Sequence, residues 1–196
     1  MNGVNMAAVY VVQTLGSLYL LIVLLRFILQ LVRADFYNPI SQFIVRATQP
    51  LLQPLRRVVP GFAGIDVASL VLALVVQLVV MAIIIKLMGY ALPAVLQLLA
   101  WSLVGITALF LKIFFFALII SVILSWVAPQ SHNPAVILVF QLCEPVLAPI
   151  RRFLPALGGL DLSPIFAFIA LNLLDMLLIT NLAIATGMPR GLTLAL

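Results

Sequence analysis

An internal repeat constrains the fold of this chain more than any other feature of its sequence. The stretch from Gln49 to Asp66 occurs again, without insertion or deletion, from Glu144 to Asp161. Most identical positions hold residues that set backbone geometry or carry charge, whereas most apolar positions between them vary. The identities include Asn38/Asn133, Pro39/Pro134, Pro50/Pro145, Leu52/Leu147, Pro54/Pro149, Arg56/Arg151, Arg57/Arg152, Pro60/Pro155, Gly64/Gly159 and Asp66/Asp161. Chance similarity between apolar segments does not conserve these residue types, so the chain is two copies of one unit.

The composition places both copies in a membrane. Hydrophobic residues make up 66% of the chain and charged residues 8%, with a mean hydropathy of +1.34. Soluble domains carry about 25% charged residues. We therefore expect an all-α integral membrane protein.

Four apolar segments are long enough to cross a hydrocarbon core of about 30 Å. We predict spans over Met6–Val32, Val67–Leu92, Trp101–Val127 and Leu162–Ile184. The alternative for the first, a cleaved signal peptide, is disfavoured because its apolar run is too long and no basic segment precedes it. An unbroken helix from Pro93 to Val127 would be about 50 Å long, so we expect a short interfacial piece before Trp101.

Each copy therefore reads as span, interfacial segment, span, with the first repeat in residues 1–95 and the second in residues 96–196. Two spans per copy give both copies the same orientation, as parallel tandem repeats.

The interfacial segments begin with a helix start signal. Asn38 and Asn133 are predicted N-caps, with Pro39 and Pro134 at the first helical position. In the first copy, apolar side chains recur at helical spacing opposite polar ones, which predicts an amphipathic helix in the membrane surface. The apolar set is Ile40, Phe43, Ile44, Ala47 and Leu51, and the polar set is Gln42, Arg46, Gln49 and Gln53. The second copy is more apolar and is expected to lie deeper.

The repeated prolines Pro50, Pro54 and Pro60, with Pro145, Pro149 and Pro155, remove backbone donors, which predicts short helical turns joined by kinks. Asp66 and Asp161, two residues after Gly64 and Gly159, are read as N-caps of the following spans. A functional role for the two aspartates is the alternative.

The arginines predict the orientation. Six of them fall at one end of the spans: Arg33, Arg46, Arg56, Arg57, Arg151 and Arg152. The other end has Lys86 and Arg190. The positive-inside rule places the Arg-Arg loops in the cytoplasm and both termini in the periplasm. Topology and attraction to anionic lipid account for the net charge of +5, so no nucleic-acid partner is expected.

Polar and charged residues within membrane spans are rare, so each one is interpreted separately. Arg26 is close enough to a membrane surface to act as a snorkelling anchor. Lys112 and Asp175 both lie about 20 Å from the arginine-rich ends of their spans, which makes them a candidate ion pair. Gln77 and Asn172 occupy equivalent repeat positions and suit a polar contact between the halves. These polar residues could serve either hydrogen bonding between helices or a transport path, and both alternatives stay open.

No motif supports catalysis or a cofactor. The sequence has no nucleophile elbow, phosphate loop or paired carboxylates. Its single cysteine, Cys143, excludes an internal disulfide, and without clustered histidines there is no metal framework.

The repeated pattern of a span, Asn-Pro, P-L-L-x-P-L-R-R-x-x-P, G-x-D and a second span resembles the YggT family of bacterial inner-membrane proteins, related to the YlmG proteins. The resemblance covers nearly the whole chain. It implies a role in the biogenesis or positioning of membrane complexes: cell division, nucleoid organisation, cytochrome maturation or osmotic-stress tolerance. The first copy departs from the pattern at Gln49, where the second has Glu144, and at Ala68, where the second has Ser163.

Two functions follow. The first is a non-enzymatic scaffold or assembly factor in the inner membrane, whose arginines Arg56, Arg57, Arg151 and Arg152 bind anionic lipid or a membrane-protein partner, with a homo-oligomer also possible. The same arginines could instead only enforce topology. The second function is an ion or solute pathway that involves Lys112, Asp175, Asn172 and Gln77.

Overall fold

The computed structural model describes residues 3–61, 64–153 and 161–189, and throughout these ranges the secondary structure is helical, with no strand. The elements in order are α1 (Gly3–Leu31), α2 (Pro39–Val58), α3 (Val67–Leu87), α4 (Val95–Val127), α5 (Pro134–Phe153), α6 (Ser163–Leu174), the π-helical η1 (Asp175–Ile179) and α7 (Thr180–Ala185).

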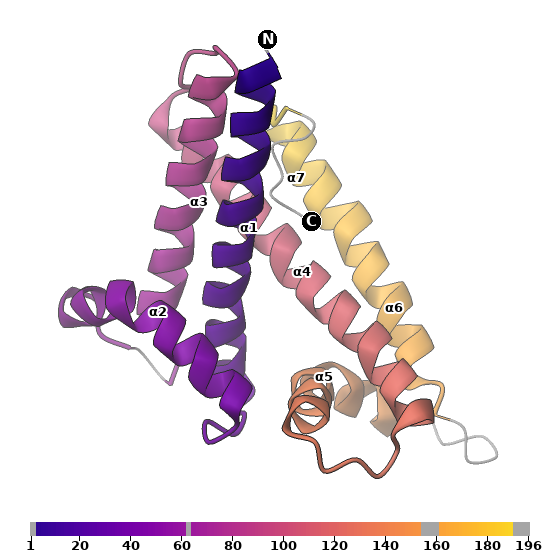
Figure 1. Cartoon of the computed structure of the whole chain (residues 1–196). Helices are drawn as coiled ribbons and strands as arrows, with labels where there is room; N and C mark the ends of the chain where they lie inside the picture. The colour runs from indigo at the N-terminus through magenta and orange to yellow at the C-terminus, as the bar shows by residue number, and fades with distance from the viewer. Residues whose placement is uncertain (1–2, 62–63, 154–160, 190–196) are drawn as a thin grey trace.

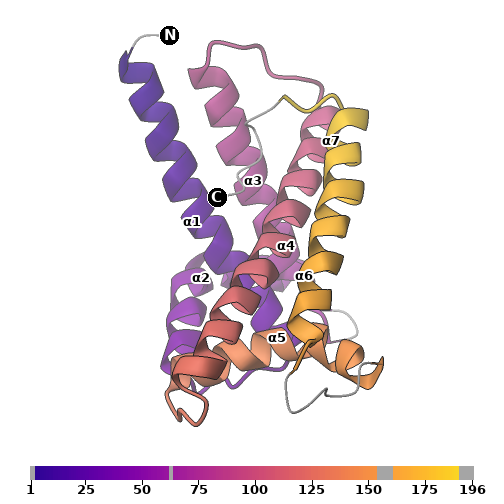
Figure 2. The same ribbon diagram turned by 90° about the vertical axis from the view of Figure 1, so that its right-hand side faces the viewer.

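The long helices run side by side, and the two proline-containing helices lie across one end of them (Figure 1). This end, which carries α2, α5 and the double arginines, is called the arginine end below. α1 begins and α7 ends at the opposite end (Figure 2). Within the first repeat α1 packs on α3 and α2 lies against both, and in the second α4 and α6 pack together with α5 against both. The halves meet mainly through α3 and α4.

Five helical stretches in the described residues are long and apolar enough to cross a membrane, one more than predicted. Four correspond to the predicted spans: α1, α3, α4 and the continuous stretch Ser163–Ala185. The fifth is α5, which the sequence placed at the interface. α3 ends five residues before the predicted end, because the chain turns at Gly89, whose φ of 83° favours glycine.

The predicted break before Trp101 is wrong. α4 is one helix of 33 residues, about 50 Å long by helix rise. Because α4 runs obliquely past α1 and α3 (Figure 1), it does not have to stand perpendicular to the membrane. Its first turns are held by a tertiary bond, since Trp101 Nε1 donates to the Thr186 carbonyl at 2.9 Å.

The predicted short turns joined by kinks are also wrong for the described residues. α2 continues through Pro50 and Pro54, and α5 continues through Pro145 and Pro149. Each internal proline removes one hydrogen bond and bends a helix without necessarily ending it. Pro60 lies just after α2, whereas Pro155 and Gly159 lie outside the described residues.

The buried face of α2 differs from its predicted apolar face. Ser41, Ile44, Thr48 and Leu52 are buried, while Phe43 is 61% exposed and Leu51 also faces outward. Of the predicted apolar set, Ile40, Phe43 and Leu51 therefore face away from the protein, as is suitable for an interfacial helix that meets lipid.

Close approaches between long helices depend on two glycines. A Cβ atom at Gly16 of α1 would lie 2.6 Å from Val80 Cγ1 of α3, and one at Gly105 of α4 would lie 2.5 Å from Gln77 Nε2 of α3. Small residues at such positions let membrane helices approach closely.

Candidate interfacial site

The starts of α2 and α5 are capped in the same way. The Asn38 side chain accepts a hydrogen bond from the Ile40 amide at 2.9 Å, and Asn133 accepts one from the Ala135 amide at 2.9 Å. Proline follows each asparagine and occupies the first helical position. The predicted capping of both interfacial helices is confirmed.

The first of these caps also joins the two repeats. Asn38 Nδ2 donates to the Pro134 carbonyl at 2.6 Å, and the Asp35 amide donates to Gln141 Oε1 at 3.3 Å. Asn38 is buried, whereas Pro134 is exposed, so the link lies at the edge of the protein interior. Hydrogen bonds therefore join the beginning of α2 to the first half of α5 at the arginine end.

In the first repeat, an ion pair joins the end of α2 to the beginning of α3. Arg56 Nη2 lies 2.5 Å from Asp66 Oδ2. The Asp66 carboxylate also accepts from the Ser69 amide at 3.3 Å and the Ser69 hydroxyl at 2.6 Å. Asp66 therefore caps α3, as predicted, and fixes α2 at the same time. Its side chain is 4% exposed.

The second repeat has the equivalent pair. Arg151 Nε donates to Asp161 Oδ2 at 2.9 Å, and Arg151 Nη1 donates to Glu144 Oε2 at 2.9 Å. The Asp161 side chain accepts from the Ser163 amide at 2.9 Å. Gln49, in place of the acid at Glu144, leaves Arg56 with one described carboxylate partner where Arg151 has two.

Burial and charge act in opposite directions on these groups. Burial alone would raise the pKa of Asp66, but the hydrogen bonds from Arg56 and Ser69 outweigh it and hold the pKa below its usual value. The pKa of Asp161 is lowered in the same way, against a desolvation effect, by Ser163 and Arg151. Both carboxylates are therefore ionised at neutral pH.

The second arginine of each pair is arranged differently. Arg57 and Arg152 are exposed, and among the described residues neither forms an ion pair. The four arginines that the sequence grouped together thus divide by partner. Arg56 and Arg151 are held by carboxylates although they are 40% and 44% exposed, whereas the outward-facing pair, Arg57 and Arg152, forms no ion pair with the described residues.

Arg26 does not act as a surface-reaching anchor, which corrects the sequence interpretation. Its side chain is 6% exposed. Its Nη1 donates to the Val45 carbonyl at 3.1 Å and to Thr48 Oγ1 at 3.0 Å, which fastens α1 to α2. Arg26 Nε is buried without a hydrogen-bond partner in the described structure.

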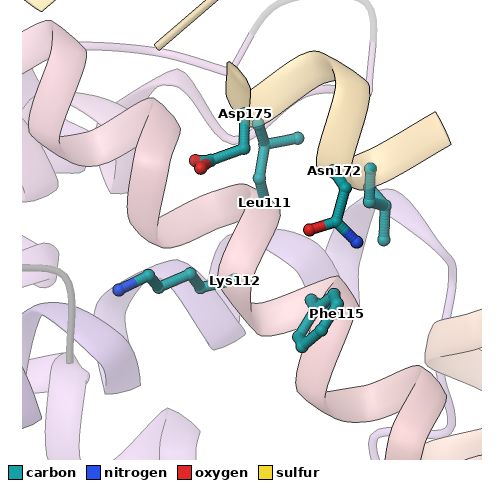
Figure 3. A pocket seen from close by; sticks show the side chains of 6 residues that line it. Leu111, Lys112, Phe115, Asn172 and Asp175 are labelled. Atoms are coloured by element: carbon teal, nitrogen blue, oxygen red, sulfur yellow. The ribbon is translucent and has the colours of Figure 1, made fainter. Parts of the chain in front are cut away.

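The polar residues predicted within the spans lie in two different places. Lys112 and Asp175 line one pocket of about 130 Å³, together with Asn172, Leu111, Phe115 and Leu171. Figure 3 shows the Lys112 side chain extending from α4, with the Asp175 carboxylate above it on the neighbouring helix. The pocket brings the two groups together, and their pairing stays a prediction. Asn172 Nδ2 donates within its own helix to the Phe168 carbonyl at 2.8 Å.

Gln77 lies elsewhere, where α3 and α4 of the two halves meet, but it does not form the polar contact that was predicted there. It is fully buried against Gly105 of α4. Its side-chain oxygen and nitrogen have no hydrogen-bond partner in the described structure. The Gln77 and Asn172 positions are equivalent in the repeat, but only Gln77 faces the other half.

Sequence reasoning missed the two Arg–Asp ion pairs. A signal was present, because arginine and aspartate are separated by the same spacing in both copies. The burial of Arg26 and the link from Asn38 to Pro134 left no comparable local signal. Among the described residues, no group of histidine, cysteine, aspartate and glutamate could hold a metal ion.

Comparison with known proteins agrees with this two-part organisation. A family model described as CCB3/YggT matches residues 5–88 and again residues 100–182. An uncharacterized protein of Pseudomonas aeruginosa is 70% identical over 197 residues, covering 100% of both chains. The YggT protein of Escherichia coli K12 is 38% identical over 167 residues, covering 85% of this chain and 86% of the relative.

A plant relative matches a shorter region. YlmG homolog protein 2, chloroplastic, of Arabidopsis thaliana is 45% identical over 64 residues, covering 32% of this chain and 25% of the relative. No solved structure matches the chain.

Proposed function

This chain belongs to the CCB3/YggT family, and from that premise we propose that it is a non-enzymatic, multi-pass inner-membrane protein that positions or assembles membrane complexes. In this proposal four helical stretches cross the membrane: α1, α3, α4 and Ser163–Ala185. α5 lies in the membrane surface as α2 does. Its crosswise position beside α2 supports that placement (Figure 1), and the positive-inside rule puts the arginine end in the cytoplasm.

One observation carries the scaffold proposal: the same ion pair fixes the interfacial helix in both repeats. Arg56 is bound to Asp66 and Arg151 to Asp161, so the ends of α2 and α5 cannot swing away from the following spans without breaking a charged hydrogen bond. The adjacent Arg57 and Arg152 are exposed. The arrangement presents two guanidinium groups from fixed helices, as a docking surface for an acidic partner requires.

Replacing arginine by lysine distinguishes binding of a partner from a role in setting the membrane topology. Arginine presents a forked donor that binds carboxylates bidentately, whereas lysine keeps the charge and loses the fork. We expect the double variant Arg57→Lys with Arg152→Lys to insert in the normal orientation but to recover at least tenfold less of its membrane partner in cross-linking and mild-detergent pull-downs. Arg46→Lys, which changes another exposed arginine of α2, is the matched control and should recover the partner normally.

Two outcomes would count against the proposal. If the double variant retains its partner and its cellular activity, the outward-facing arginines serve topology alone. If the Arg46→Lys control loses as much partner as the double variant, the interaction depends on general arginine content and not on these two positions.

An ion or solute pathway remains the second candidate, because Lys112, Asn172 and Asp175 share a pocket. This pocket of about 130 Å³ is below the usual range of about 300–1,000 Å³ for a small-molecule site. An ion-flux assay in liposomes, comparing the wild type with Asp175→Asn, tests it. Flux that depends on Asp175 would favour the pathway over the scaffold.

A further inference from the structure

A cavity at the arginine end of the first repeat is not used by the ion pairs described above. Its volume is about 740 Å³, within the range of ligand sites. It lies between the end of α1, the middle of α2 and the segment before α3. The residues that line it include three arginines, Arg26, Arg33 and Arg56.

The charge in this cavity is only partly balanced. Asp66 neutralises Arg56. Arg26 donates to a carbonyl and a hydroxyl, which carry no charge, and Arg33 has no ion-pair partner in the described residues. Among the described residues, neither Arg26 nor Arg33 forms an ion pair, and Asp66, which also acts on Arg26 electrostatically, is already bound to Arg56.

Arg26 also carries an unsatisfied donor beside the cavity. The side chain is more than nine-tenths buried, yet its Nε has no hydrogen-bond partner in the described structure. Buried donors in proteins are nearly always satisfied by protein, water or ligand. Because Nε is closed to solvent, an anion in the cavity would balance the charge of the Arg26 guanidinium without bonding to Nε.

The rim of the cavity indicates which anion fits. Leu31, Phe36 and Ile65 line it, and each is between 40% and 48% exposed. A free phosphate ion has no apolar part that could contact this rim, whereas a phospholipid carries acyl chains close to its phosphate. We propose that this cavity binds the phosphate of an anionic phospholipid, with Arg26 and Arg33 on the phosphate and the apolar rim on the chains.

The second repeat contains an internal comparison. A cavity of about 450 Å³ lies at the equivalent place, where Ser121, Ser125 and Trp126 stand at the positions of Arg26, Gln30 and Leu31. Its one arginine, Arg151, is bound by two carboxylates. The two cavities thus share position but not charge, and the specific lipid site belongs to the first repeat alone.

The inference rests on the proposed placement of the arginine end at the membrane surface, and it is tested apart from the scaffold role. The full chain, purified in neutral detergent, is titrated with short-chain phosphatidylglycerol, with short-chain phosphatidylcholine and with inorganic phosphate, and bound lipid is counted by native mass spectrometry. We expect phosphatidylglycerol to bind at one site and at least tenfold more tightly than phosphatidylcholine.

The variants locate the site. Arg33→Gln removes an exposed side chain and should weaken phosphatidylglycerol binding about tenfold or more, the usual value of a charged hydrogen bond. Arg46→Gln removes the same charge from an exposed position outside the cavity and should leave binding unchanged. Arg26→Gln should abolish binding, but because Arg26 also fastens α1 to α2, the Arg33 variant decides the matter.

Three results would overturn the assignment: equal binding of the two lipids, equal effects of Arg33→Gln and Arg46→Gln, or saturation of the site by inorganic phosphate at concentrations that displace the lipid. None of these results changes the partner-recovery assay, so failure of the lipid site and failure of the scaffold proposal are distinguishable.

Discussion

Asp66 performs two roles with one carboxylate, capping α3 through Ser69 and binding Arg56 of α2. Its repeat equivalent, Asp161, does the same through Ser163 and Arg151 but is 44% exposed, against 4% for Asp66. Solvent competes with hydrogen bonds at the exposed site, so the two carboxylates should contribute unequally to stability.

We expect Asp66→Ala to lower the free energy of unfolding by about 2 kcal/mol, from the lost cap and the lost charged hydrogen bond. Asp161→Ala should cost about 1 kcal/mol or less. Thermal unfolding of both variants in the same detergent measures the difference. An equal or larger effect at Asp161 would show that burial does not set the strength of these pairs.

The same residues predict a dependence on pH. Because the pKa of Asp66 is lowered from its model-compound value of 3.8 on folding, the folded state binds its proton less readily than the unfolded chain. The stabilisation is therefore complete above about pH 4 and is lost as the pH falls through the lowered value. We expect the wild-type unfolding temperature to fall more steeply below pH 4 than that of Asp66→Asn, in parallel acid titrations.

Lys112 and Asp175, which share a pocket between α4 and η1, permit a test of the predicted pairing. Lys112→Met or Asp175→Leu alone should destabilise the protein more than the two together, since each single change leaves an uncompensated charge in a low-dielectric region. Thermal unfolding of the four proteins gives the coupling energy. Additive effects would mean that the two groups are not partners.

At the scale of helices, Gly16 permits a close contact between α1 and α3 in the first repeat. A Cβ there would lie 2.6 Å from Val80 Cγ1, so Gly16→Ala should push α1 away from α3 and cost about 1–3 kcal/mol. Gly3→Ala is the control, since nothing lies within 4 Å of its Cβ position. Val80→Ala should partly rescue Gly16→Ala in thermal unfolding, and failure of the rescue would mean that the loss has another origin.

The helices also show which parts of the fold local sequence determines. Asn38 and Asp66 cap their helices as local rules predict. The passage of α2 through Pro50 was not predictable in this way, because packing against other elements stabilises helix where local propensity would interrupt it. The break before Trp101 was predicted from helix length, and residues 95–101 contain no proline or glycine that would interrupt α4.

The residues of the candidate site also differ in whether local sequence predicts their contacts. The role of Arg56 could have been predicted, since its aspartate partner recurs at the same spacing. The role of Arg26 could not, because burial beneath α2 depends on how two distant segments pack. Helix rise gives the position of Arg26 along α1, but position along a helix does not tell which neighbour covers the side chain.

For the whole molecule, the number of crossings depends on α5. In a Cys143→Ala background, single cysteines at the exposed positions Tyr37, Val58, His132 and Phe153 should all react only with a reagent that reaches the cytoplasm, and one at Tyr90 only with a periplasmic reagent. Val58 and Phe153 are repeat equivalents, 81% and 85% exposed. Labelling of positions 132 and 153 from opposite sides would establish a fifth crossing and overturn the four-span arrangement.

The hydrogen bond from Asn38 to the Pro134 carbonyl spans 96 positions of the chain. Ribosomes add about 5–20 residues each second, so roughly 5 to 20 seconds separate the synthesis of the donor from that of its acceptor. The first repeat is completed within that interval, before its acceptor exists. In a chain stalled between the two repeats the Asn38 amide therefore lacks this partner, which only synthesis of the second repeat supplies.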